Sequence, residues 1–271
     1  MCAKKKDAFN YIAEMLGGLN GKNRCMPPTS LYSEGWMLRL ILQAASEGHL
    51  EKFIPTRAGK LNWFSEARLY TPFRKGRGKA YEGFTNVDGI VGDFQWNSGT
   101  QTGVELSDNP KRFEVFEAKM FSGLSKGVKA DPEYDQAVRT VACMAETLEN
   151  AKLKRVELES LTLAYWVIAP QSQINKGLFK TQLSKTNMRK RIKNRIEQFD
   201  GPEREELRAW KTKYFEPLLK KLDEDDQLRC ISWETLIKAI GDENRRTAIK
   251  QFYIQCCLAA RRKNPYIEKG G

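Results

Sequence analysis

The sequence FEVFEAKM (residues 113–120) combines two features that rarely occur together. It alternates and is mostly apolar, which is typical of a core strand, yet it carries a glutamate and a lysine near its end. Residues i and i+2 of a strand point to the same side of a sheet. The residues that share one face are therefore Phe113, Val115, Glu117 and Lys119. Because burying an unpaired charge is costly, Glu117 and Lys119 indicate either a structural ion pair or a strand end that opens on a metal-binding cleft.

The run VDGIVGD, within a predicted strand at residues 83–96, holds two further acids, Asp88 and Asp93. They are five residues apart, so in a regular strand they face opposite sides and only one of them can meet Glu117. A hairpin-like pairing of 83–96 with 112–120 brings that aspartate beside the glutamate. Two neighbouring carboxylates repel, but both stay ionised when a divalent cation lies between them.

The composition limits which metals the chain can bind. His49 is the only histidine in the sequence, and the six cysteines form no CxxC pair. Multi-histidine zinc sites and CxxC metal or redox motifs are therefore excluded. A metal ion must be held by oxygen atoms, which favours magnesium, manganese or calcium.

The charge of the chain predicts a polyanionic partner. The 271 residues include 46 Lys and Arg against 34 Asp and Glu, a formal net charge of +12. Such a surplus attracts nucleic acid, although a merely basic soluble protein is the alternative. The sequence has no apolar run of about 18 residues and no signal-like start, so we expect a cytoplasmic protein with no membrane contact.

The apolar periodicity predicts an alternation of helices and strands. The helix LYSEGWMLRLILQAASEG (31–48) is expected to be capped by Thr29 or Ser30, and it carries Glu34 on its inward stripe. The remaining predicted core elements are strands at 63–73, 83–96 and 112–120, a helix at 133–150, and strands at 161–170 and 228–233.

The pattern Asp88 … Glu117-Ala118-Lys119 resembles the bipartite motif of the PD-(D/E)XK nuclease superfamily, the restriction-endonuclease-like fold. This resemblance implies an α/β fold with an αβββαβ core, in which a mixed central sheet is flanked by helices. It also implies that Asp88 and Glu117 hold Mg²⁺, or Mn²⁺, and that Lys119 assists the attacking water. The chain departs from the family pattern by the valine before Asp88 and by the long gap to Glu117, which requires an extended hairpin through 97–111.

Two further residues match positions that family members often use. Glu34 stands where the first core helix contributes a glutamate to the metal site and to catalysis. Gln136 stands on the helix after the lysine strand, where a catalytic polar residue is frequent. The resemblance covers about 31–170 and the predicted strand near residue 230. The expected organisation is an N-terminal helix and loop at 1–30, the nuclease-like core at 31–170, a basic helical insertion at 171–222, and the last core strand with the C-terminal helices at 223–271.

Exposed cations next to the predicted core indicate how a nucleic acid would be held. Lysine and arginine contacts to phosphates supply affinity without reading the sequence. The candidates are a glycine-interspersed loop and the segment after the lysine strand: Arg74, Lys75, Arg77, Lys79, Lys126 and Lys129. We expect a magnesium-dependent DNA nuclease, more readily an endonuclease. The alternatives are a nucleic-acid-binding protein with an inactive nuclease-like site and an RNA-directed nuclease. A homodimer is also left open.

Overall fold

The stretch at 113–120 forms most of β5 (Arg112–Ala118), the central strand of a five-stranded mixed sheet with the order β1-β2-β5-β6-β7. The fold is that of a computed structural model, which describes residues 8–20, 25–56, 59, 61–74, 82–127 and 131–263. β2 is antiparallel to both of its neighbours, β1 and β5, whereas β5, β6 and β7 are parallel to one another. The other strands are β1 (Trp63–Tyr70), β2 (Phe84–Gly92), β3 (Phe94–Trp96), β4 (Val104–Leu106), β6 (Thr162–Ala169) and β7 (Leu228–Ser232).

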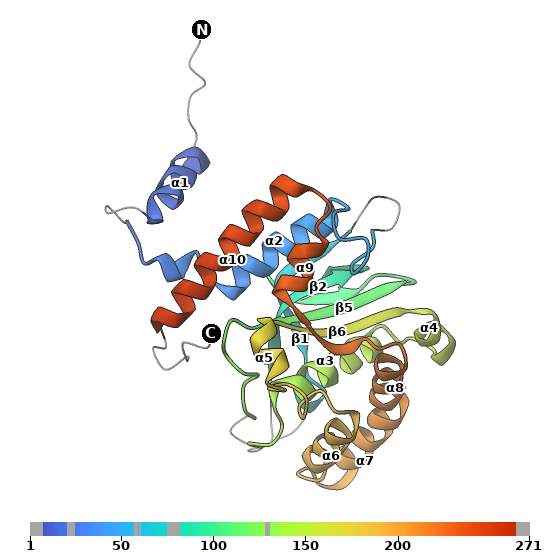
Figure 1. Cartoon of the computed structure of the whole chain (residues 1–271). Coiled ribbons are helices and arrows are strands. Elements are labelled where there is room, and N and C mark those ends of the chain that lie inside the picture. Colours follow the sequence, from blue (N-terminus) through green and yellow to red (C-terminus); the bar gives the residue numbers. More distant parts are fainter. Residues whose placement is uncertain are drawn as a thin grey trace.

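Helices cover both faces of this sheet, so the chain has an α/β fold (Figure 1). All seven residues of β5 are buried, as in a strand packed on both sides. Phe113 and Val115 belong to a hydrophobic cluster with α3 (Gln136–Asn150), whereas Phe116 and Ala118 belong to a second cluster with α2 (Glu34–Ser46). Thus the predicted alternation of β5 is confirmed.

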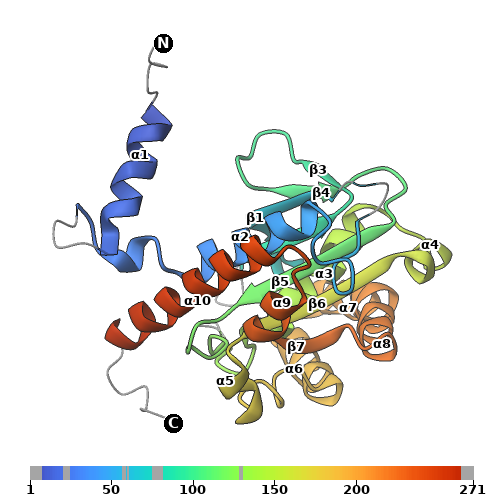
Figure 2. The same cartoon turned by 45° about the horizontal axis from the view of Figure 1, so that its top comes forward.

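The second cluster also takes in α9 (Trp233–Ala239) and α10 (Glu243–Lys263), and α10 packs against α2 on this same face of the sheet (Figure 2). On the opposite face of the sheet, α3 packs with three further helices, α6 (Lys185–Ile196), α7 (Gly201–Trp210) and α8 (Glu216–Glu224). The remaining helices are α1 (Ala8–Gly17), α4 (Arg155–Ser160) and α5 (Gln171–Asn175). The short turns are η1 (Gly18–Asn20), η2 (Pro28–Ser30), η3 (Pro72–Arg74) and η4 (Lys211–Phe215). Within the described ranges, no helix has the length and apolar character needed to cross a membrane.

Helix α2 begins later than the sequence predicts. Ser33 is its N-cap, with the Oγ atom accepting a hydrogen bond from the backbone N–H of Trp36 at 3.4 Å. The prediction that Thr29 or Ser30 caps this helix is therefore wrong. Both residues lie in the turn η2, which starts at Pro28, where the proline ring holds the backbone φ that such a turn requires.

The predicted strand at 83–96 is two strands, because the chain turns at Gly92 and Asp93. Gly92 has φ +141°, and a Cβ atom there would overlap the backbone carbonyl of Arg112. The Asp93 carboxylate then accepts hydrogen bonds from the backbone N–H groups of Lys111 (2.7 Å) and Arg112 (3.1 Å). These contacts close the base of a hairpin in which β3 pairs with β4, the extension that the long gap to Glu117 led us to expect.

Candidate active site

Asp88 lies where β2 and β5 separate. The two strands pair from Gly92↔Phe113 to Gly89↔Phe116. One residue further, the Oδ2 atom of Asp88 accepts a hydrogen bond from the backbone N–H of Ala118 at 2.7 Å. The aspartate side chain thus replaces the backbone partner that β5 loses, and this brings its carboxylate to the end of the strand.

Next to Asp88, the side chains of both β1 and β2 stop alternating regularly between the two faces of the sheet. Val87 and Ile90 belong to the same hydrophobic cluster although they are three residues apart, and so do Phe64 and Ala67 on β1. Between the latter two, Glu66 has φ +59°, in the left-handed region that a glutamate seldom adopts. Non-glycine residues in this conformation concentrate near functional sites, where the surrounding fold compensates the strain.

Glu117 is held by two side chains of α3. Its side chain is 1% exposed. Thr140 Oγ1 donates a hydrogen bond to Oε1 at 2.9 Å, and Gln136 Nε2 donates one to Oε2 at 2.7 Å. Gln136 and Thr140 are four residues apart, so they project from one face of the helix. Burial, followed by the negative charge of Asp88, raises the pKa of Glu117 well above its ordinary value, against the opposing effects of Lys119 and Thr140.

The ammonium group of Lys119 lies between the two carboxylates. Its Nζ atom is 3.8 Å from Glu117 Oε2 and 4.0 Å from Asp88 Oδ2, and only 9% of the side chain is exposed. These distances are longer than charge-assisted hydrogen bonds, which are about 2.7–2.9 Å. The carboxyl groups of Asp88 and Glu117 therefore meet around one cation, with neither of them in close contact with it.

A second ion pair on β5 has a different geometry. Arg112 Nη2 is 2.8 Å from Glu114 Oε2, and both side chains are about as buried as the Lys119 group, at 4% and 5% exposed. This pair, at the start of the strand, has the short contact expected of a buried structural ion pair. The group of Asp88, Glu117 and Lys119 at the other end of β5 has no such short contact between Lys119 and an acid.

The backbone after Lys119 is tied to three other elements. Trp233 Nε1 donates to the carbonyl of Lys119 at 2.9 Å, and the N–H of Met120 donates to Glu34 Oε2 at 2.9 Å. Gln173, on α5, accepts from the N–H of Phe121 at 3.1 Å and donates to the carbonyl of Ser122 at 3.1 Å. Phe121 has φ +65°, so the chain leaves β5 through a sharp, firmly held bend.

Glu34 and Asp93, two of the candidate metal ligands, both accept hydrogen bonds from backbone N–H groups. Glu34 bonds the backbone one residue beyond Lys119, and within the described part of the chain no group of three or more His, Cys, Asp or Glu side chains is arranged to hold a metal ion. Asp93 is occupied at the base of the β3–β4 hairpin. Of the two aspartates that the sequence leaves open, Asp88 is the one that lies beside Lys119 with Glu117.

The predicted cations are spread more widely than the carboxylates. Arg74 Nη2 pairs with Glu146 at 2.8 Å and lines a cavity of about 480 Å³. Glu146 is ten residues along α3 from Gln136, which corresponds to about 15 Å. The structure therefore does not bring Arg74 to the carboxylates. Lys126 is exposed directly after Ser125, whose backbone bonds Gln136. Lys75, Arg77, Lys79 and Lys129 lie outside the described residues.

Three residues of this neighbourhood are missing from the sequence-based prediction. Thr140 could have been found, because it is a polar residue four positions after Gln136 on a buried helix face. Gln173 and Trp233 contact the bend from 50 or more residues away in the sequence, and no local pattern points to them. Comparisons of this chain with protein-family models, with curated proteins and with solved structures find no match.

Proposed function

We propose that this protein is a magnesium-dependent nuclease that hydrolyses phosphodiester bonds of DNA, as an endonuclease, on a restriction-endonuclease-like core. The element order α2–β1–β2–β5–α3–β6 and the resemblance of Asp88 and Glu117-Ala118-Lys119 to the PD-(D/E)XK motif support this proposal. The net charge of +12 favours a polyanionic substrate. The resemblance favours DNA, and an RNA substrate is the alternative that the experiment below distinguishes.

One observation carries the proposal. The Lys119 ammonium group lies within 4.0 Å of both carboxylates but in close contact with neither. The buried Arg112–Glu114 pair on the same strand, by contrast, is in direct contact at 2.8 Å. A buried glutamate beside a partly buried aspartate, with one cation at 3.8–4.0 Å, is unfavourable in a protein without a ligand, and a second cation would relieve the repulsion.

The donor set fits a magnesium ion. Mg²⁺ is usually bound by one or two carboxylates, and keeps water and substrate phosphate as its other ligands. Asp88 and Glu117 supply two carboxylates, so a third protein acid is not required. When bound, such an ion polarises a phosphoryl oxygen and lowers the pKa of a coordinated water.

The remaining side chains have separate roles in this proposal. Gln136 and Thr140 hold Glu117 in one orientation and stabilise its ionised form. Lys119 orients the attacking water and stabilises the negative charge that develops on the phosphate. Glu34 and Gln173 fix the bend after β5, and so fix the base of the lysine side chain.

Plasmid cleavage by the Lys119→Ala variant tests the proposal. We expect the wild-type protein to nick supercoiled DNA with Mg²⁺ and not with EDTA. Lys119→Ala should lower the rate by about 10²–10³-fold, because it removes a charge aimed at the reacting group, and it should retain DNA binding. Lys111→Ala is the matched control, because Lys111 is exposed at the opposite end of the β5 region. It should cleave like the wild type.

Two outcomes would contradict the proposal in different ways. If the wild-type protein binds DNA but cleaves nothing with Mg²⁺ or Mn²⁺, it is a nucleic-acid-binding protein with an inactive site. If it cleaves single-stranded RNA in preference to single-stranded and duplex DNA, the chemistry stands and the substrate is wrong.

A further inference from the structure

Polar side chains of α6 and of the residues just after it contact the segment 131–135, which precedes α3. Arg191 and Arg195 are four residues apart on α6, so their side chains project from one side of the helix, and Gln198 follows just beyond the C-cap Glu197. Arg191 forms an ion pair with Asp135, and Gln198 Nε2 donates to Asp131 Oδ2 at 2.9 Å. This face of the helix is engaged with the protein interior and is not available to a substrate.

Arg195 anchors this contact to the core. Its side chain has no exposed surface, and its Nη2 atom lies 3.2 Å from Glu82 Oε1. The guanidinium group also lies over the rings of Phe73 (5.0 Å) and Tyr134 (5.5 Å). A charge buried in this way is stable only in a well-defined geometry, so α6 is held in one position relative to the start of α3.

Asp135 connects α6 to the candidate active site. Its Oδ1 atom accepts hydrogen bonds from the N–H groups of Ala137 (2.9 Å) and Val138 (3.2 Å), which makes it the N-cap of α3. The next residue is Gln136, which donates to Glu117 and exchanges two hydrogen bonds with the backbone of Ser125. A continuous chain of contacts therefore runs from Arg191 through Asp135 and Gln136 to Glu117.

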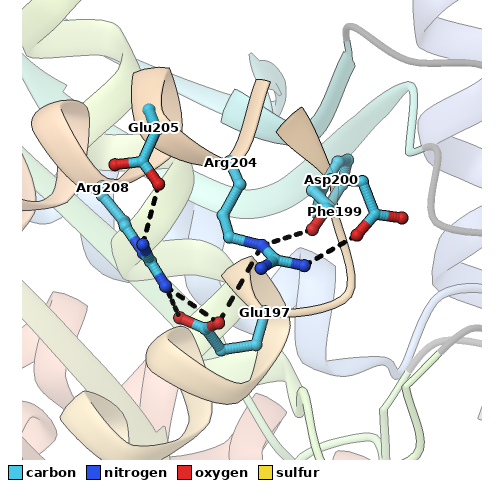
Figure 3. Close-up of polar contacts among 6 residues, drawn as sticks. All are labelled: Glu197, Phe199, Asp200, Arg204, Glu205 and Arg208. Carbon is cyan, nitrogen blue, oxygen red and sulfur yellow. Dashed lines mark hydrogen bonds and ion pairs between the residues drawn. The ribbon is translucent and has the colours of Figure 1, made fainter. Parts of the chain in front are cut away.

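The far end of α6 is fixed independently of this chain. Figure 3 shows Glu197, the C-cap of α6, between Arg204 and Arg208 of α7. Arg208 Nη2 bonds both Glu197 oxygens, at 2.9 and 3.0 Å, and also pairs with Glu205 through Nη1 at 2.8 Å. These ion pairs are partly exposed and involve none of residues 131–136, so they lie outside the chain of contacts that runs from Arg191 to Glu117.

We propose that Arg191 is a positioning residue: by pairing with Asp135 it sets Gln136 against Glu117, so that the helical insertion controls the carboxylate at the metal site. The inference rests on the proposed nuclease function for its kinetic consequences. Its structural part, the fixing of the start of α3, can be measured without any activity.

The kinetic test compares Arg191→Met with Arg208→Met, which removes the same charge from an ion pair of the insertion that does not reach residues 131–136. Arg191→Met should lower kcat on plasmid DNA and raise the Mg²⁺ concentration for half-maximal rate, by about 10–100-fold, with KM for DNA unchanged. Arg191→Lys should recover most of the loss, because a point charge can pair with the single Asp135 oxygen. Arg208→Met should match the wild type.

A second variant covers the case in which Arg191→Met does not fold. Asp135→Asn keeps an N-cap of equal quality but removes the ion pair, so it should reproduce the loss. The double variant should lose no more than either single variant. The inference is overturned if both single variants behave like Arg208→Met, or if only KM changes.

Hydrogen exchange separates the failure of this inference from the failure of the proposed function. If the wild-type protein has no metal-dependent cleavage, the proposed function falls, and the amides of residues 131–140 decide the inference. They should exchange roughly tenfold faster or more in Arg191→Met and Asp135→Asn than in Arg208→Met. Equal exchange in the three variants would overturn the inference, whatever the activity.

Discussion

At the scale of single residues, two aspartates on one short run have opposite roles. Asp88 adds a negative charge beside the buried Glu117, and this charge, after burial itself, raises the pKa of the glutamate. Asp93 instead accepts two backbone N–H groups and stabilises the base of a hairpin. The same side chain is thus a source of repulsion at one position and of structural stability at the other.

We expect Asp88→Asn to abolish the stabilisation of the protein by magnesium. If Asp88 and Glu117 hold the ion, Mg²⁺ at roughly 100 times its Kd should add about 2.7 kcal/mol to the free energy of unfolding of the wild type. Thermal melting with and without Mg²⁺ measures this as a rise in Tm. The rise should disappear in Asp88→Asn and persist in the control Asp93→Asn; the reverse pattern would assign the metal to Asp93.

The same variant should change how stability depends on pH. The folded-state pKa of Glu117 is raised above 4.5, so the metal-free protein loses stability as the pH rises from about 4.5 through that raised value. Asp88→Asn removes the second cause of the shift, so the loss should be smaller and the metal-free variant more stable than the wild type at neutral pH. Urea unfolding across this pH range, in EDTA, measures the difference.

The central residues of the site could be proposed from sequence because their signal is local. Charged residues inside apolar strands are conspicuous, and the pairing of two neighbouring strands brings Asp88 to Glu117. The interruption of β1 at Glu66 could not be predicted, because it depends on a left-handed backbone conformation and glutamate has no preference for that conformation. The contact of Gln173 with the bend after Lys119 could not be predicted either, because it forms only when β6 pairs with β5 and brings α5 to the end of β5.

At the scale of elements, boundaries were less predictable than the elements themselves. The predicted helices and strands of the core all occur, but Ser33 caps α2 and the strand at 83–96 breaks in two. A hydrophobic pattern identifies the face that an element buries. The ends of elements depend on competing caps and turns, and several polar residues before α2 were eligible.

Gly92 is the last residue of β2, and its replacement tests whether the turn after β2 requires a glycine. Gly92→Ala should lower the free energy of unfolding by about 2 kcal/mol or more, since a Cβ would overlap the Arg112 carbonyl at a φ of +141°. Gly99→Ala is the control, because Gly99 also has a positive φ, of +89°, but nothing lies within 4 Å of its added Cβ. Urea denaturation should show a clearly smaller loss for Gly99→Ala; equal losses would mean that backbone strain alone, without the overlap, accounts for the effect.

At the scale of the whole molecule, part of the most basic stretch of the sequence is paired with acids of the protein itself. In α6, four cations are engaged in ion pairs within the protein: Lys185 with Asp223, Arg189 with Glu216, Arg191 with Asp135 and Arg195 with Glu82. Arg191 and Arg195 therefore bind the insertion to the core, whereas Lys185 and Arg189 bind α6 to α8. Lys126 is exposed directly after the candidate site, so it is the cation that we expect to contact a nucleic acid there.

The salt dependence of DNA binding can test this assignment. The logarithm of the binding constant falls with the logarithm of the salt concentration by about 0.9 for each phosphate contact. Lys126→Ala should therefore weaken binding to all sequences alike and reduce that slope by about one. Lys152→Ala is the matched control, because Lys152 is exposed after the other end of α3, about 22 Å along the helix from Gln136. Fluorescence anisotropy in EDTA at several salt concentrations measures both slopes, and a slope for Lys126→Ala equal to that of Lys152→Ala would show that the segment after β5 does not contact the substrate backbone.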